Sequence, residues 1–169
     1  MLKSFLSVEL CFLIPILIGC AGSGSSSRSG GASSSSYIAN VGTATSYDVK
    51  DKTQRLINKH HYVVFRAEES QDMIYFETEW KDRAPFQDEE EGGILQARTR
   101  FILEARPRIR AEVAGSSDLN NVRLVFENMV LRESSPEWIY LPMTAMCKSY
   151  VRRIADDLIT DFRTGFRKF

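Results

Sequence analysis

Six arginines stand close together in the middle of the chain, and their guanidinium groups could bind an anionic ligand. A guanidinium is a planar fork of donors that binds a phosphate or a carboxylate through two hydrogen bonds. On a strand, alternate residues share one side, so several of these side chains would project from one face of a sheet. The pattern predicts a cationic binding surface made of Arg98, Arg100, Arg106, Arg108, Arg110 and Arg123.

Acidic residues nearby leave a second interpretation of these arginines open. Opposite charges that face each other on neighbouring strands stabilise a sheet, and arginines paired in this way have a structural role. The carboxylates available for such pairs are Glu77, Glu79, Glu104, Glu112 and Glu127. Arginines left without acidic partners would favour a site for phosphates or for an acidic patch of a protein.

Histidines and acidic clusters do not form a recognisable reaction centre. His60 and His61 are adjacent, and adjacent side chains on a strand point apart, so we expect them at a helix end or a turn. The acidic run 88–91 lacks the ligand spacing of a calcium loop and predicts a solvated loop tip. Asp156, Asp157 and Asp161 have helical spacing and interleave with arginines, which predicts i,i+4 ion pairs.

Motifs of known enzymes are absent from the sequence as well. There is no zinc-protease helix, no CxxC pair, no nucleophile elbow and no phosphate loop. Lysine and arginine together number 22, as do aspartate and glutamate, so no overall field points to nucleic acid. The sequence therefore predicts a protein that is not an enzyme, uses no metal or cofactor and does not bind nucleic acid.

The N-terminus has the layout of a secretory signal peptide. Lys3 supplies a positive charge, an apolar core follows, and Gly19 is a small residue at its end. The apolar core is about 9 residues long, too short for a bilayer that needs about 20. We expect residues 1–19 to be a signal peptide rather than a membrane-spanning helix.

The stretch Leu17-Ile18-Gly19-Cys20 resembles the lipobox of bacterial lipoproteins. The resemblance implies that Cys20 takes a diacylglyceryl group, that the chain is cut before it, and that the new N-terminus is acylated. Several acyl chains anchor a protein durably, because each buried methylene contributes about 0.8 kcal/mol. Ala21 is not the aspartate that retains such proteins in the inner membrane, so the resemblance implies the periplasmic face of the outer membrane. An ordinary signal peptide is the alternative.

Composition divides the rest of the chain into a tether and a single domain. Residues 20–44 are rich in serine and glycine, which predicts a flexible tether, and residues 45–169 suit one globular domain. Cys147 would be the only unmodified cysteine after removal of the signal peptide. A small buried core residue is the favoured role for it, and a reactive thiol is the alternative.

Hydrophobic periodicity predicts an α+β fold. We expect a helix over 46–59 capped by Ser46, a loop over 82–95, and a long helix from Pro142 or Met143 to Arg167. The expected strands cover 62–67, 73–81, 96–106, 121–133 and, as a short strand or arm, 108–114. Four or five antiparallel strands with both helices on one face are the resulting architecture. The expected sheet core is Ile74, Phe76, Trp80, Phe101, Leu103, Val122, Leu124 and Phe126.

The sequence indicates a function through the predicted location of the protein more than through any catalytic motif. The order of elements is similar to that of periplasmic domains of outer-membrane assembly lipoproteins, the helix-grip type and the lipopolysaccharide-assembly type. That resemblance implies an accessory protein that binds an envelope protein. Binding of an anionic envelope lipid or glycan through the arginines is the alternative. Residues 138–141 are expected to pack under the long helix or to form an exposed docking edge.

Overall fold

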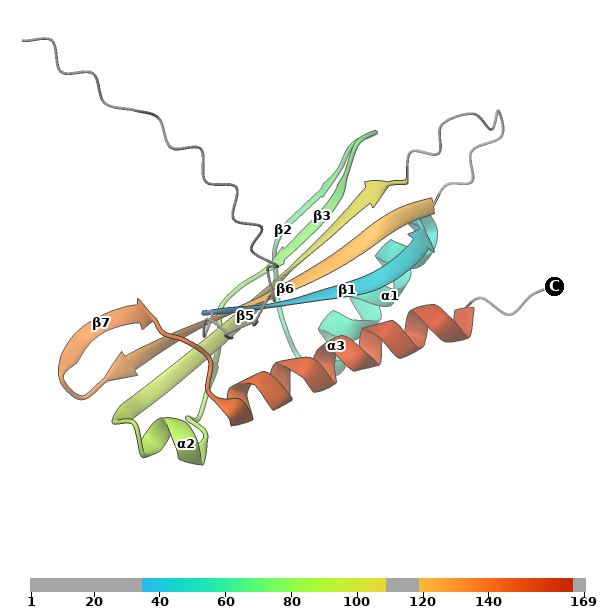
Figure 1. Ribbon diagram of the computed structural model, residues 1–169. Coiled ribbons are helices and arrows are strands. Elements are labelled where there is room, and N and C mark those ends of the chain that lie inside the picture. Colours follow the sequence, from blue (N-terminus) through green and yellow to red (C-terminus); the bar gives the residue numbers. More distant parts are fainter. Residues whose placement is uncertain (1–34, 109–118, 166–169) are drawn as a thin grey trace, which may run out of the picture. The chain divides into compact units, whose positions relative to one another are not determined.

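An antiparallel sheet with helices on one face makes up the described part of the chain in the computed structural model (Figure 1). The structure describes residues 35–108 and 119–165, all within one compact unit, Ala32–Phe169. The elements are β1 (Ser36–Thr45), α1 (Ser46–Lys59), β2 (Val64–Glu69), β3 (Ile74–Thr78), β4 (Lys81–Arg83), α2 (Gln87–Glu90), β5 (Ile94–Pro107), β6 (Leu119–Arg132), β7 (Ser135–Tyr140) and α3 (Ala145–Gly165).

Two long strands, β5 and β6, form the centre of the sheet. They pair with each other from Ile94 to Pro107, and the strand order across the sheet is β1-β6-β5-β3-β2. The outer edge of β6 carries β1 and then β7, and the outer edge of β5 carries β3 and then β4. Each long strand is therefore flanked by two shorter strands in succession.

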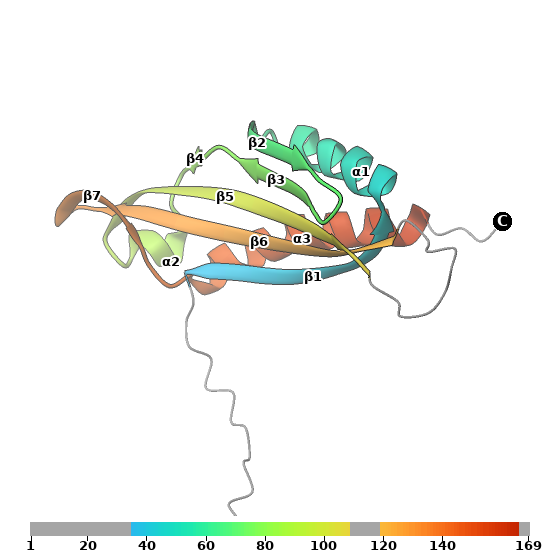
Figure 2. The same ribbon diagram turned by 90° about the horizontal axis from the view of Figure 1, so that it is seen from above.

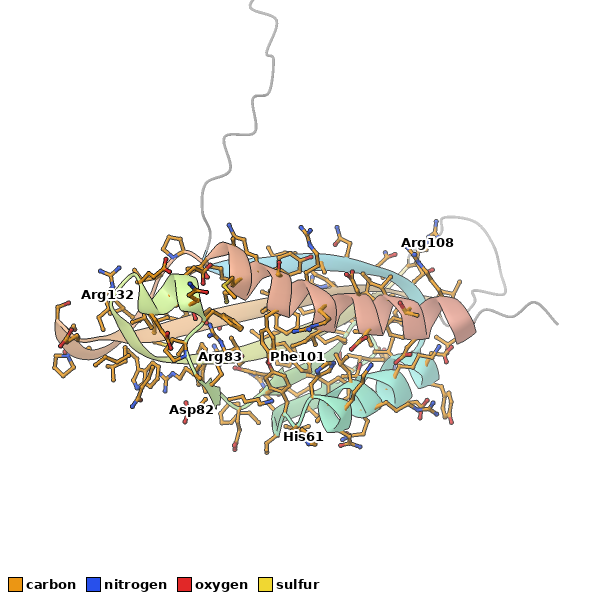
Figure 3. The ribbon with its side chains drawn as sticks, turned by 90° about the horizontal axis from the view of Figure 1, so that it is seen from below. His61, Asp82, Arg83, Phe101, Arg108 and Arg132 are labelled. Carbon is orange, nitrogen blue, oxygen red and sulfur yellow. The ribbon has the colours of Figure 1, made fainter. Side chains whose placement is uncertain are left out.

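The core lies between the sheet and the helices α1 and α3. Alternate residues of β5 and β6 face the helices, and Phe101, Leu103 and Phe126 are fully buried there. Figure 3 shows Phe101 beneath α3 and α1. The stripe of α3 that covers the sheet is Val151, Ile154, Ala155, Leu158 and Phe162. Each large apolar side chain contributes about 1.5–3 kcal/mol on burial, so this layer sets the fold.

The α+β fold predicted from the sequence is confirmed, with more strands than the four or five expected. The helix over 46–59 has the predicted bounds, although Thr45 rather than Ser46 caps it, since the Thr45 hydroxyl accepts from Asp48 N at 3.1 Å. The predicted long helix exists as α3 and begins at Ala145, after Pro142.

The prediction of a flexible tether over 20–44 is wrong for its last part. Residues 36–44 belong to β1, which pairs with β6 and buries Ala39, Val41 and Ala44. The buried residues are small, and a bulge at Gly42, whose φ is +124°, breaks their alternation. A strand of this composition looks like tether in the sequence. The preceding part of the predicted tether lies outside the described residues.

The predicted strand over 73–81 is in fact two strands that pair with different parts of β5. β3 ends at Thr78 and β4 begins at Lys81. The alternation of side chains between the two faces of the sheet therefore does not continue from one strand into the next. Ile74 and Phe76 face the helices as predicted. The prediction that Trp80 joins this core is wrong, because its ring contacts arginines on the opposite face of the sheet.

The predicted loop over 82–95 contains β4, the short helix α2 and the start of β5. Its acidic run is not a solvated loop tip throughout. Glu89 is 1 % exposed and binds the Arg83 guanidinium at 2.6 and 2.7 Å. Asp88 accepts hydrogen bonds from Thr144 Oγ1 and Met146 N, at the start of α3. The two carboxylates therefore hold α2 to β4, through Glu89, and to the start of α3, through Asp88.

Histidines and Cys147 have the structural roles that were favoured. His60 caps the C-terminus of α1, His61 follows with φ 52°, and Cys147 is fully buried. The expected pairing of Asp157 within its own helix is replaced by contacts with Lys59 and His60 of α1, both at 2.9 Å. None of the helices in the described ranges is long and apolar enough to span a bilayer.

Candidate functional site

The candidate binding surface is the sheet face opposite the helices, which we call the open face. Figure 2 looks onto the strands, and Figure 3 looks from the side where the helices lie. No helix of the described residues packs on the open face. Register aligns Ile38 of β1, Val125 of β6 and Ile102 of β5 in one row across its middle. Ile38 is 50 % exposed, so this aliphatic row reaches solvent.

Arg100 is neutralised by two glutamates on the strands beside it. Its guanidinium contacts Glu77 of β3 at 2.5 Å and Glu127 of β6 at 2.7 Å. Partial burial acts to lower the pKa of Arg100, but the hydrogen bond and charge of Glu127 and the charge of Glu77 outweigh it and raise that pKa. The structural interpretation is confirmed for this arginine, because its fork of donors is already occupied.

Arg98 is held by aromatic rings instead of carboxylates. Its guanidinium carbon lies 4.2 Å from the ring centre of Trp138 and 4.9 Å from that of Trp80. One terminal nitrogen lies 3.4 Å from Met129 Sδ, and the buried Nε has no hydrogen-bond partner. A guanidinium this close to two indole rings gains cation–π attraction from each of them. The Arg98 guanidinium is thus packed against aromatic rings and is not a free cation.

Trp80, Trp138 and Tyr140 form what we call the aromatic end of the open face. Tyr140 meets Trp80 edge to face at 6.2 Å between ring centres, and Arg100 lies 4.7 Å from the Trp80 ring. Trp138 and Tyr140 come from β7, a strand bonded only to β6 within the described sheet. The docking-edge interpretation of residues 138–141 therefore fits these two rings. Ile139 and Leu141 instead pack on a small core of Ile94, Ala97 and Val130.

Arg106, Arg108 and Arg123 lie at the other end of the open face, which we call the cationic end. The guanidinium of Arg106 is 69 % exposed and meets Glu104 only at 3.8 Å. Arg108 and Arg123 are exposed, and no carboxylate of the described residues lies within 4.0 Å of either. The prediction of a cationic binding surface is therefore still supported at these three positions. Arg110, the sixth predicted residue, lies outside the described residues.

The five described arginines are consequently not one surface. Arg98 and Arg100 are engaged within the sheet, whereas the cationic end shows, among the described residues, only the 3.8 Å pair of Arg106 with Glu104. Sequence reasoning missed Ile38, Asn40 and Trp80 as open-face residues. Ile38 and Asn40 were hidden because β1 was not recognised, and Trp80 because the break between β3 and β4 gives no signal in the hydrophobic pattern.

A second polar cluster lies buried on the helix side of the sheet. Arg83 binds Glu89 and also contacts Asn128 Oδ1 at 2.9 Å and Cys147 Sγ at 3.4 Å. Burial is the main cause that raises the pKa of the Cys147 thiol to about 11, although the charge of Arg83 acts to lower it. A buried thiol that stays protonated is a poor nucleophile. This cluster therefore ties α2 and α3 to the sheet.

Comparison with known proteins does not indicate a role for the aromatic end or for the cationic end of the open face. Neither the protein-family models nor the curated proteins contain a match to this chain. Within residues 35–108 and 119–165, no group of three or more histidine, cysteine, aspartate or glutamate side chains could hold a metal ion. The open face is therefore interpreted from its own geometry.

Proposed function

We propose that this chain is a lipid-anchored, non-enzymatic accessory protein of the cell envelope that binds a partner protein through its open face. Cys20 is the proposed lipidation site, and the periplasmic face of the outer membrane is the proposed location. The likeness in element order to outer-membrane assembly lipoproteins makes that assembly the process we propose. The single observation that carries the binding proposal is the solvent-exposed aliphatic row, beside which Arg100 is already paired with two glutamates.

A protein partner suits the middle of the open face better than a polyanion does. Ile38, Val125 and Ile102 offer apolar area, and the charge of Arg100 is cancelled by its two glutamates. Protein interfaces are enriched in aromatic residues, methionine and arginine, and their centres are depleted of unpaired charge. The aromatic end, with Arg98 between its tryptophans, has that composition. The row and the aromatic end together form the proposed interface.

The anchor is tested by the mass of the N-terminal peptide of protein taken from membranes. Lipidation predicts a peptide that begins at Cys20 and carries acyl chains on it. Cys20→Ala should stay unmodified and uncut, because the acceptor thiol is gone. An unmodified Cys20 at the N-terminus, or a chain that keeps residues 1–19, would contradict the anchor.

The interface is tested by chemical crosslinking in intact envelopes followed by purification of the chain. Ile38→Arg places a charge in the aliphatic row at a half-exposed position, so the fold should persist. Tyr47→Arg is the matched control, because Tyr47 is 73 % exposed on α1, away from the open face. We expect one partner to co-purify with the wild type and the control and to be lost with Ile38→Arg. Equal recovery from both variants would contradict the interface.

The cationic end favours a second function, the binding of an anionic envelope lipid or glycan. Among the described residues of this end, Arg106, Arg108 and Arg123 carry three positive charges, and Glu104 is the carboxylate that pairs with one of them. Such a local excess of one sign attracts ligands of the other sign, even though the whole chain is neutral. Binding to anionic vesicles that disappears at high salt is the expected behaviour.

A further inference from the structure

A shallow pocket at the cationic end places two arginines and two asparagines around one space. It holds about 430 Å³ and is lined by Asn40, Glu104, Arg106, Asn121, Val122 and Arg123. The residues come from β1, β5 and β6, three neighbouring strands of the sheet. The described lining of the pocket is thus fixed by strand pairing.

Strand register explains why the two arginines line the same pocket. Arg106 of β5 lies opposite Asn121 of β6, and Arg123 follows Asn121 by two residues on the same side of β6. Such diagonal neighbours have Cα atoms about 7–8 Å apart, within reach of long side chains that close on one ligand. Asn40 of β1 lies opposite Arg123 on its other side. Two forks of donors and two side-chain amides therefore border the same space.

A bulge in β1 gives Asn40 its place beside Arg123. The pairing of β1 with β6 shifts between Asn40 and Gly42, so Val41 is buried while Asn40 stays exposed. Gly42 has a φ of +124°, a backbone angle that residues other than glycine rarely adopt. Bulges of this kind re-aim a side chain next to a binding site.

The donors at the pocket suit an anion with many acceptor oxygens. Among the described lining residues, Arg106 and Arg123 against Glu104 leave an excess of one positive charge. A phosphoryl monoester is an anion at pH 7 and has three acceptor oxygens. A carboxylate has two oxygens, fewer acceptors than two guanidinium groups and two amides can fill. Phosphate is therefore the better match in number of acceptors.

We propose that this pocket binds a phosphoryl monoester group through Arg106 and Arg123, with Asn40 and Asn121 as additional donors. The proposal deepens the second function above and rests on it. Glu104 is the restraining group: its carboxylate lies 3.8 Å from the Arg106 guanidinium and opposes an incoming anion. Loss of that carboxylate should therefore tighten binding, and the contrast between a pocket arginine and a distant one separates the pocket from general attraction to a basic surface.

Inorganic phosphate and phospholipid vesicles are the two probes, because a free phosphate and a lipid headgroup share this chemistry. Phosphate binding is measured by titration calorimetry on the full chain, and vesicle binding by flotation. The vesicles are phosphatidylcholine alone, or with phosphatidic acid, a monoester, or with phosphatidylglycerol, a diester. All variants carry Cys20→Ala, so that the N-terminal run contributes equally to each.

Three single substitutions test the pocket. Arg123→Gln should weaken phosphate or phosphatidic acid binding by about tenfold, the loss expected for a charged hydrogen-bonding partner. Glu104→Gln should strengthen the same binding. Arg132→Gln should change nothing, because Arg132 is an exposed arginine of the same strand at the opposite end of the sheet, as Figure 3 shows relative to Arg108. Thermal unfolding confirms that each variant is folded.

Binding of phosphate alone would identify a soluble ligand, and binding of phosphatidic acid vesicles alone would identify a headgroup. Either supports the pocket if the variants behave as stated. An equal effect of Arg123→Gln and Arg132→Gln, no gain with Glu104→Gln, or no binding of either probe would overturn it. Phosphatidylglycerol binding that is insensitive to Arg123→Gln would keep the second function and reject the pocket. Phosphate binding without binding to any anionic vesicle would reject a lipid role and keep the pocket.

Discussion

The guanidinium of Arg98 stacks on the indole of Trp138, with 4.2 Å between the guanidinium carbon and the ring centre. This contact joins β5 to the edge strand β7 across β6. It also places a positive charge within the aromatic surface. That charge makes the surface more selective for its partner than aromatic rings alone would be. The stack therefore makes the aromatic end a fixed surface rather than a set of independent side chains.

Arg98→Ala should loosen the aromatic end without unfolding the domain. The two tryptophans of the chain, Trp80 and Trp138, both contact Arg98, so fluorescence excited selectively at tryptophan reports on this stack. We expect a shift and broadening of the emission with a loss of stability of about 1 kcal/mol or less for each cation–π contact at a half-exposed site. Unchanged emission would show that the stack does not order the rings. Arg132→Ala is the matched control.

Removal of one partner of the buried Arg83–Glu89 pair should be costly. The side chains are 9 % and 1 % exposed, so a single substitution leaves an uncompensated charge in the interior. Arg83→Met and Glu89→Leu should each cost about 3–5 kcal/mol of unfolding free energy, and the double variant should cost less than either. Urea unfolding of the four proteins measures this. Additive losses in the double variant would contradict the coupling.

Cys147 should resist thiol reagents in the folded protein. Its pKa is raised to about 11, with burial as the main cause, so little thiolate exists at pH 8. In a Cys11→Ala/Cys20→Ala background, iodoacetamide should label Cys147 only after denaturant is added. Rapid labelling of the native chain would revive the interpretation of Cys147 as a reactive thiol.

Asp157 should make a small, pH-dependent contribution to stability. Partial burial acts to raise the pKa of Asp157, but the hydrogen bonds from Lys59 and His60 outweigh it and lower that pKa. A lowered folded-state pKa means that the stabilisation is complete above the unfolded value of about 3.9 and is lost as the pH falls through the lowered value.

Asp157→Asn should therefore cost less than about 1 kcal/mol at pH 7, since the pair with Lys59 is partly exposed. Unfolding free energies of the wild type and the variant, measured between pH 7 and pH 2, should converge at the acid end. A difference that grows on acidification would contradict the stated direction of the pKa.

Long periodic segments were predictable from the sequence, and short or irregular ones were not. α1, β5, β6 and α3 each carry an apolar pattern long enough to fix element type and buried face. β1 was missed because its buried residues are small and its phase breaks at Gly42. α2, with 4 residues, and β4, with 3, are too short for any period to show.

The partners of the arginines could not be predicted in the same way. Strand faces were correct for Arg98 and Arg100, but their partners depend on register and on the break between β3 and β4. Trp80 illustrates the point: continued alternation places it in the core, whereas the break places it against Arg98 and Arg100. Only pairing across the sheet separates the engaged arginines from the more exposed ones at the cationic end.

Site-specific photocrosslinking from the open face tests the central claim most directly. Benzoylphenylalanine replaces Ile38 in the aliphatic row, or Tyr47 on α1 as the control, in cells that lipidate the chain. We predict one discrete protein adduct from position 38, none from position 47, and loss of the adduct with Cys20→Ala. Equal adducts from both positions, or no adduct from position 38 in intact envelopes, would contradict a partner-binding open face.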